Sequence, residues 1–232
     1  MSSVSFGAGG CLGAFFHLGV AKALAEQFDT RRLRVCGCSA GAWVAAILLV
    51  RDPACFDAIC DRFLSSLQAH RGCVYWWIED LLRQTLAAVF AAHPLQEDAM
   101  DRIHLSVTRL TWFPWPTWTN VHETGFASPA ELVESILRSS MIPGLVGFRW
   151  HHLDGAFTDH LPRVDDRTIT VDFLSANADI HPKQLFNPFL LVLFKPSRIR
   201  CEAMYEHGYR CAHRFLQQGR VVQSACAAKP PA

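Results

Sequence analysis

The sequence predicts one α/β domain with a mainly parallel central sheet. Short apolar runs suited to buried strands alternate with longer apolar segments suited to helices, an order typical of α/β sandwiches. Glycine-rich segments follow the first two expected strands. With 232 residues, 50% of them hydrophobic, the chain can bury one sizeable core.

Two strand–helix units are expected at the N-terminus. Residues 4–6 and 33–36 are short apolar runs of the kind that form buried strands, and an apolar helical segment follows each. The helices expected in this half of the chain are 13–26, 40–50, 55–69 and 76–91.

The second half adds further strands and two helices. Ser128-Pro129-Ala130-Glu131 is a capping box with proline at the first helical position, which predicts a helix ending at Ser139. Strands are expected at 103–109, 118–122, 168–171 and 190–193, and a closing helix at 202–217 that stops at Gly219. We expect one domain over residues 1–224 and a flexible tail over 225–232.

Composition narrows the functional classes. The net charge is +1 and no run of Lys and Arg carries interleaved aromatics, so nucleic acid is not an expected partner. The nine cysteines include no Cys-x-x-Cys pair, which argues against a zinc site and against a secreted disulfide framework. The N-terminus lacks a signal-peptide pattern and no apolar run approaches the ~20 residues of a bilayer span. We expect a cytoplasmic protein that is not secreted and holds no metal.

The segment Gly37-Cys38-Ser39-Ala40-Gly41 predicts a nucleophile elbow between a buried strand and an apolar helix. In such a turn, Gly37 and Gly41 let the backbone pass closely while Ser39 projects its hydroxyl at the helix N-terminus. There the helix dipole and free N–H groups favour a developing oxyanion. A glycine-flanked loop serine without catalytic role is the alternative interpretation.

A glycine-rich loop, Phe6-Gly7-Ala8-Gly9-Gly10-Cys11-Leu12-Gly13, opens the first expected helix. Such loops bind dinucleotides, phosphates or oxyanions. No Gly-Lys-Ser/Thr follows, and no acidic residue lies at the distance that a dinucleotide unit requires. An elbow follows about two dozen residues later, and this order favours acyl transfer.

A third segment, His152-Leu153-Asp154-Gly155-Ala156, begins a polar loop that ends at Pro162. With the two glycine motifs, it makes the sequence resemble the patatin-like phospholipases, in particular the animal group that includes adipose triglyceride lipase. The resemblance spans nearly the whole chain. It implies a patatin-like three-layer sandwich with a mainly parallel central sheet.

The resemblance also implies a Ser-Asp dyad without histidine. Ser39 would carry the acyl group, Asp154 would be the general base, and Gly155 is the motif glycine beside it. The oxyanion loop would consist of Gly9, Gly10, Cys11, Leu12 and Gly13. No metal or organic cofactor is implied.

Two positions depart from the family pattern. Leu12 stands where plant and bacterial members carry a basic residue, which leaves the oxyanion to backbone donors from Gly10, Cys11 and Gly13. Ala8 replaces a loop glycine, which matters only if this position needs a positive φ.

The expected partner is a lipid ester at a membrane or lipid-droplet surface, with triacylglycerol lipase ahead of phospholipase. Residues 112–118 place three tryptophans and a phenylalanine in a proline-bearing connection. Such rings suit the headgroup layer of a lipid surface, although a cluster folded back onto the body is the other reading. A protein coactivator is compatible with the family, and the sequence identifies none.

Two other functions stay open. One is an α/β-hydrolase esterase with a Ser/Asp/His triad, for which His160, His181, His207 or His213 would have to serve. The other is a weakly active lipid-binding regulatory protein. We expect His17 to be a packed histidine of the first helix and Asp159 to orient the loop that carries Asp154.

Overall fold

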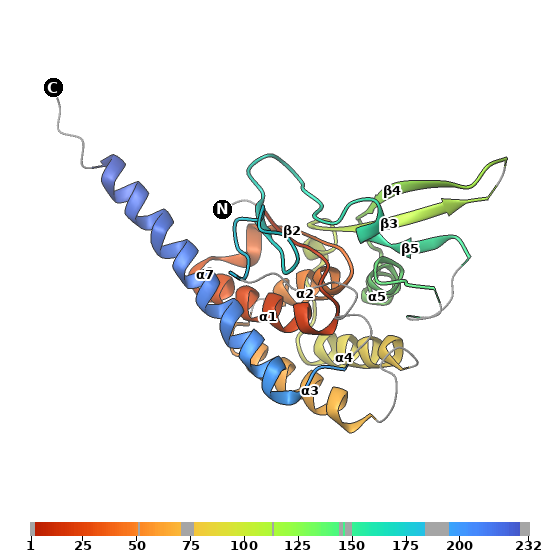
Figure 1. Ribbon diagram of the computed structural model, residues 1–232, viewed down its shortest axis with the longest axis horizontal. Helices are drawn as coiled ribbons and strands as arrows, with labels where there is room; N and C mark the ends of the chain where they lie inside the picture. Colours follow the sequence, from red (N-terminus) through yellow and green to blue (C-terminus); the bar gives the residue numbers. More distant parts are fainter. Residues whose placement is uncertain are drawn as a thin grey trace.

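The computed structural model describes residues 3–50, 52–70, 77–112, 114–143, 146, 150–183 and 195–227. A six-stranded sheet with the order β4-β3-β2-β1-β6, and with β5 beside β3, forms its centre (Figure 1). β1, β2, β3 and β6 run parallel, whereas β4 and β5 are antiparallel to β3. The predicted α/β fold with a mostly parallel sheet is confirmed. The strands are β1 Ser3–Phe6, β2 Arg34–Gly37, β3 Ile103–Thr111, β4 Thr117–Glu123, β5 His152–Asp154 and β6 Ile169–Val171.

Some helices pack directly on this sheet, and others pack on those helices. α2 contacts β1, β2 and β3, and α5 contacts β3 and β5, while α1 packs on α2 and α7 packs on α1. α2 is buried along nearly its whole length because its sequence is apolar on every face. The bounds are α1 Gly10–Gln27, α2 Ala40–Leu48, α3 Cys55–Ala69, α4 Ile78–Ala92, α5 Pro129–Ser139 and α7 Arg198–Ala227.

Two glycines allow α1 and α7 to lie against one another. A Cβ added at Gly19 would stand 2.0 Å from the Tyr205 carbonyl oxygen, and one at Gly208 would stand 2.0 Å from the Phe16 carbonyl oxygen. Only glycine fits where two helix backbones approach so closely. α7 therefore supports the helix whose first turn faces the candidate site.

Strand β5 is the element that the sequence did not predict. Its three residues were expected in a loop, because a run this short carries no readable periodicity. β5 pairs with β3 beyond the point where β2 ends: Gly37 is level with Leu105, and Asp154 with Val107. The end of β5 therefore lies next to the turn that follows β2.

Two expected helix boundaries need correction. α7 does not stop at Gly219 but continues to Ala227, so residues 225–227 of the expected tail are helical. α1 begins at Gly10, three residues earlier than expected. The capping of α5 is confirmed, since Ser128 Oγ accepts a hydrogen bond from the Glu131 N–H at 3.2 Å. The strand expected at 190–193 and the end of the tail lie outside the described residues.

Within the described part of the chain, no helix combines the length and hydropathy needed to cross a bilayer. The described cysteines are free thiols, and all but the half-buried Cys11 are buried. They pack as small apolar residues, as the scattered spacing predicts.

Candidate active site

Ser39 occupies the tight turn between β2 and α2. Its backbone has φ 52° and ψ −127°, and it is the one non-glycine residue with positive φ among those described. A Cβ at Gly41 would stand 2.1 Å from the Phe6 carbonyl oxygen, and one at Gly37 would stand 2.5 Å from the Gly41 carbonyl oxygen. The elbow geometry therefore requires both glycines.

The Ser39 and Asp154 side chains interact, and both residues line the same cavity. The two residues meet because β5 continues along β3 where β2 stops. The Ser39 backbone N–H is held separately: it donates to the Ser139 carbonyl oxygen and to Ser139 Oγ, each at 3.1 Å. The end of α5 thus fixes the turn that carries Ser39.

Asp154 is 3% exposed. Burial raises its pKa to about 6, because desolvation disfavours the charged carboxylate. Three smaller effects lower this pKa without offsetting the burial. They are the interaction with the Ser39 side chain, a hydrogen bond of 2.9 Å from the Ala156 N–H, and the nearby charge of His160. A carboxylate in this range is a suitable base near neutral pH.

Ser39 and Asp154 line one cavity of about 430 Å³. Its remaining walls are mostly apolar, which suits an acyl chain better than a polar substrate. The lining residues are Ala8, Gly9, Gly10, Ser39, Ile142, Asp154, Ala156, Phe157, His160 and Leu174.

The N-terminus of α1 lies at this cavity. The helix begins at Gly10, so the N–H groups of Gly10, Cys11 and Leu12 belong to its unpaired first turn. Gly13 differs from the expectation, because its N–H donates to the Gly9 carbonyl oxygen at 2.9 Å and is not free for an oxyanion. Gly9 is still needed sterically: a Cβ there would stand 2.7 Å from the Gly13 Cα.

Alanine at position 8, in place of the family's loop glycine, causes no backbone strain. Ala8 is not among the described residues with positive φ, whereas Gly10 has φ 57°. The residue of this loop that adopts the left-handed conformation is therefore a glycine, Gly10.

The candidate histidines lie in different surroundings. His160 lines the cavity, and its Nε2 stands 2.7 Å from Oδ2 of the fully buried Asp172. This carboxylate raises the pKa of His160. His181 Nδ1 stands 2.9 Å from the Pro182 carbonyl oxygen, and the remaining candidates, His207 and His213, lie on α7.

His17 is a buried residue of α1, as expected. It has no exposed surface, and burial lowers its pKa to about 4, so it is neutral. Its ring packs against the Phe6 and Phe16 rings, with centroid distances of 5.7 and 5.9 Å.

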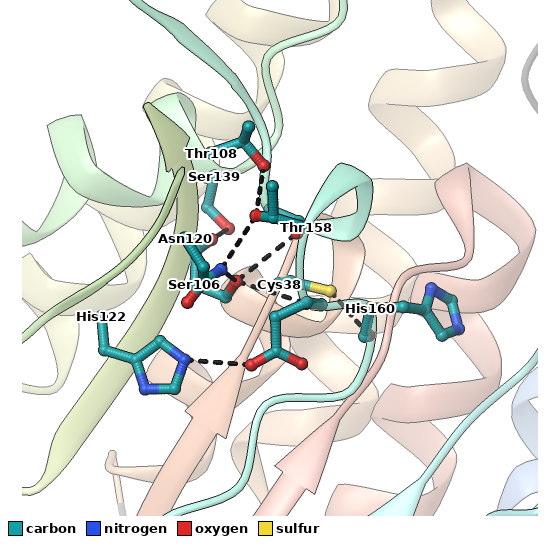
Figure 2. A network of polar contacts seen from close by, with 10 residues as sticks. Cys38, Ser106, Thr108, Asn120, His122, Ser139, Thr158 and His160 are labelled. Atoms are coloured by element: carbon teal, nitrogen blue, oxygen red, sulfur yellow. Dashed lines mark hydrogen bonds and ion pairs between the residues drawn. The ribbon is translucent and has the colours of Figure 1, made fainter. Parts of the chain in front are cut away.

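A network of polar side chains that includes residues of β3, β4 and α5 is a feature that sequence reasoning missed (Figure 2). Thr108 Oγ1 donates to the Asp154 carbonyl oxygen at 2.8 Å, and Ser139 Oγ donates to the Ser106 carbonyl oxygen at 2.6 Å. On β4, Asn120 Nδ2 donates to Ser106 Oγ at 2.7 Å. The available signal was that Ser106 and Thr108 lie two residues apart in β3, which places both side chains on one face of the strand.

Large aromatic side chains are exposed near the cavity. Trp112, Trp115 and Trp118 are 52%, 77% and 55% exposed, which argues against a cluster folded back onto the body. Phe157 of the cavity wall is 52% exposed, and its ring meets that of Trp118 edge-on at a centroid distance of 5.9 Å. Phe113, which belongs to the same expected cluster, lies outside the described residues.

Among the described residues, no group of three or more His, Cys, Asp or Glu side chains is arranged to hold a metal ion. Asp159 was expected to orient the loop that carries Asp154. Its Oδ2 lies 3.0 Å from His122 Nε2.

Comparison with known proteins gives consistent matches. The patatin-like phospholipase family model matches residues 4–165. Patatin-like phospholipase domain-containing protein 4 of Homo sapiens is 26% identical over 92% of this chain and 96% of that protein. Domain-containing protein 2 of the same family and species is 29% identical over 99% of this chain, which spans 51% of that protein. VipD from Legionella pneumophila shares the fold at 12% identity, with a TM-score of 0.54 over 94% of this chain and 67% of VipD.

Proposed function

Because the chain belongs to the patatin-like phospholipase family, we propose that it is a serine acyl hydrolase whose Ser39–Asp154 dyad cleaves fatty acyl esters of lipids. Family membership implies lipid acyl hydrolysis. The observation that carries the dyad is that Ser39, in its strained turn, and the buried Asp154 carboxylate line the same largely apolar cavity and interact there.

The proposed reaction has two halves. Ser39 Oγ attacks the ester carbonyl carbon while Asp154 takes its proton, and the leaving alcohol recovers that proton when the ester C–O bond breaks. Asp154 then takes a proton from water as the water oxygen attacks the acyl carbon, and it returns this proton to Ser39 Oγ when the Ser39–acyl bond breaks and the fatty acid leaves. The N–H groups of Gly10, Cys11 and Leu12 are the proposed donors to each oxyanion.

We place neutral esters such as triacylglycerol ahead of phospholipids. His160 is the one basic side chain among the described residues that line the cavity, and it is already paired with the buried Asp172. A phosphate headgroup would therefore find no unpaired positive charge there, whereas an acyl chain finds apolar walls.

We further propose that the protein acts peripherally on a membrane or lipid droplet. The exposed tryptophans of the β3–β4 hairpin lie beside the cavity wall through the contact of Trp118 with Phe157. Indole rings are suited to the lipid–water boundary. The buried free thiols favour a reducing compartment, so the proposed location is the cytoplasmic side of that surface.

The two rival functions predict different sites. His160 and Asp172 resemble the His-Asp part of a triad, but the carboxylate that interacts with the Ser39 side chain is that of Asp154. A weakly active binding protein would have little use for the strained backbone of Ser39, since such strain is typical of functional sites.

The test combines a fluorophosphonate probe with a panel of acyl esters. The probe should label the wild type and leave Ser39→Ala unlabelled, with ester hydrolysis lost in the same variant. His160→Gln should retain most activity, whereas Asp154→Asn should not. Equal losses in His160→Gln and Asp154→Asn would support the triad instead, and undiminished labelling of Ser39→Ala would place the nucleophile elsewhere.

A further inference from the structure

One face of β4 contacts three successive residues of the loop that follows Asp154. The Trp118 ring meets Phe157, Asn120 Nδ2 donates to Thr158 Oγ1 at 3.0 Å, and His122 Nε2 stands 3.0 Å from Asp159 Oδ2. Residues two apart in a strand point to the same side, so this pairing uses the strand's own repeat. β4 thus contacts three consecutive residues of the loop that follows Asp154.

Asn120 connects this face of β4 to Asp154 through a chain of polar contacts. Its partner Thr158 Oγ1 lies 2.8 Å from Thr108 Oγ1, and Thr108 donates to the carbonyl oxygen of Asp154. A second branch runs from Asn120 to Ser106 Oγ, which donates to the Asp159 carbonyl oxygen at 3.2 Å. Figure 2 shows the start of both branches, where Asn120 points toward Ser106 and Thr158.

The other end of β4 carries the exposed aromatic side chains. Figure 1 shows that the β3–β4 hairpin projects away from the helices. Trp115 in its connection is 77% exposed, and Trp112 Nε1 donates to the Trp150 carbonyl oxygen at 2.8 Å, just before β5 begins. β4 therefore joins the exposed aromatic side chains to the loop that follows Asp154.

We propose that β4 couples lipid docking at the aromatic hairpin to Asp154, the proposed general base, with Asn120 as the positioning residue that holds the loop after Asp154. This inference rests on the proposed function, and it adds that docking raises the turnover of the site as well as its access to substrate.

The exposure of these contacts explains why docking would matter. Asn120, His122 and Thr158 are exposed, so in water their hydrogen bonds compete with solvent. A lipid surface against the hairpin excludes water and orders the strand, which strengthens the same bonds. The carboxylate of Asp154 is then held more narrowly toward Ser39, and small losses of alignment are costly in catalysis.

The test measures hydrolysis of a soluble short-chain acyl ester with and without vesicles of diether phosphatidylcholine, which an ester hydrolase cannot cleave. We expect vesicles to raise the wild-type kcat by about threefold or more, well within the ~10²-fold range that alignment controls. Asn120→Ala should sediment with vesicles as the wild type does, yet lose this stimulation with KM little changed. Thr119→Ala, on the opposite face of β4, is the matched control and should keep it.

The stimulation is a ratio within one variant, so a partly unfolded preparation does not imitate the result. Stimulation of Asn120→Ala equal to that of the wild type would overturn the inference. Binding of wild type to vesicles without stimulation would also overturn it, while leaving the proposed hydrolase function intact. Failure of wild type to bind vesicles would overturn it together with the docking proposal, and ester hydrolysis would still be judged by the Ser39→Ala comparison.

Discussion

At the scale of single residues, Ser39 and Asp154 both occupy states that an ordinary residue avoids. Ser39 has positive φ without being glycine, and Asp154 carries its carboxylate at 3% exposure. Each state costs folding free energy and each serves the proposed reaction, because the turn projects the hydroxyl and burial keeps the base from being too weak. Stability and activity therefore oppose one another at these two positions.

The pH dependence of activity follows from Asp154. A general base works only when deprotonated, and burial raises the pKa of this carboxyl to about 6. The kcat/KM of a soluble ester should therefore fall as pH drops below about 6. Asp154→Asn should reduce turnover by ~10² or more across the whole range, since the amide cannot accept the proton. An acidic limb centred near pH 4, the ordinary range of Asp, would contradict the assignment.

The same pKa predicts a pH-dependent gain of stability in Asp154→Asn. Above pH 6 the folded wild type holds a buried negative charge that the unfolded chain exposes to water, whereas below 3.8 the carboxyl is protonated in both states. A rise of about two pKa units corresponds to ~3 kcal/mol, and this net value already includes the favourable contacts of the carboxylate with Ser39 and Ala156. We expect the variant to be about 1–3 kcal/mol more stable at pH 8, a difference that disappears near pH 4. Urea unfolding at the two pH values measures it, and a variant less stable at pH 8 would contradict the burial argument.

At the scale of elements, sequence reasoning succeeded where structure is local. The elbow around Ser39 and the capping of α5 by Ser128 depend on neighbouring residues, and both are found where the sequence predicts them. β5 and the network through Asn120 depend on which strands pair across long stretches of sequence, and no local pattern records that pairing. Gly219 did not end α7, because a glycine weakens a helix without forbidding it.

The exposed hairpin yields a docking prediction at this scale. Replacing Trp112 and Trp115 together by serine should weaken sedimentation with liposomes or lipid droplets, because the loss of two exposed indoles removes apolar contact area. Since both side chains are mostly exposed, the melting temperature should change little. Ile199→Ser, at a residue 78% exposed at the start of α7, serves as the control and should bind as the wild type does.

A soluble short-chain ester separates docking from chemistry in the same double variant. Its hydrolysis in the absence of lipid should stay close to wild type, because neither tryptophan is among the residues that line the cavity. Normal sedimentation of the double variant would place the docking surface elsewhere. A lowered melting temperature with loss of both activities would instead assign these rings to the packing of the domain.

At the scale of the whole molecule, α7 connects the end of the chain to the beginning of the site. It packs along α1, and the first turn of α1 carries the proposed oxyanion donors. The crossing is close because Gly19 and Gly208 leave room for carbonyl oxygens of the facing helix. A displacement of α7 is therefore expected to move α1 and, with it, the amides that face Ser39.

Gly208→Ala tests this arrangement, because two effects of opposite sign compete in it. Alanine favours a helix over glycine by about 1 kcal/mol, which alone would stabilise α7. The added Cβ, however, would lie 2.0 Å from the Phe16 carbonyl oxygen, and backbone cannot rotate away as a side chain can. Overpacking costs about 1–3 kcal/mol in ordinary cores and more where backbones must separate, so we expect a net loss of about 2 kcal/mol and a melting temperature lower by roughly 4–8 °C. Arg210→Ala, exposed on the same helix, should change stability by less than about 0.5 kcal/mol. If Gly208→Ala instead raised the melting temperature, helix propensity would outweigh the contact, and α7 could not be holding α1 in the register described.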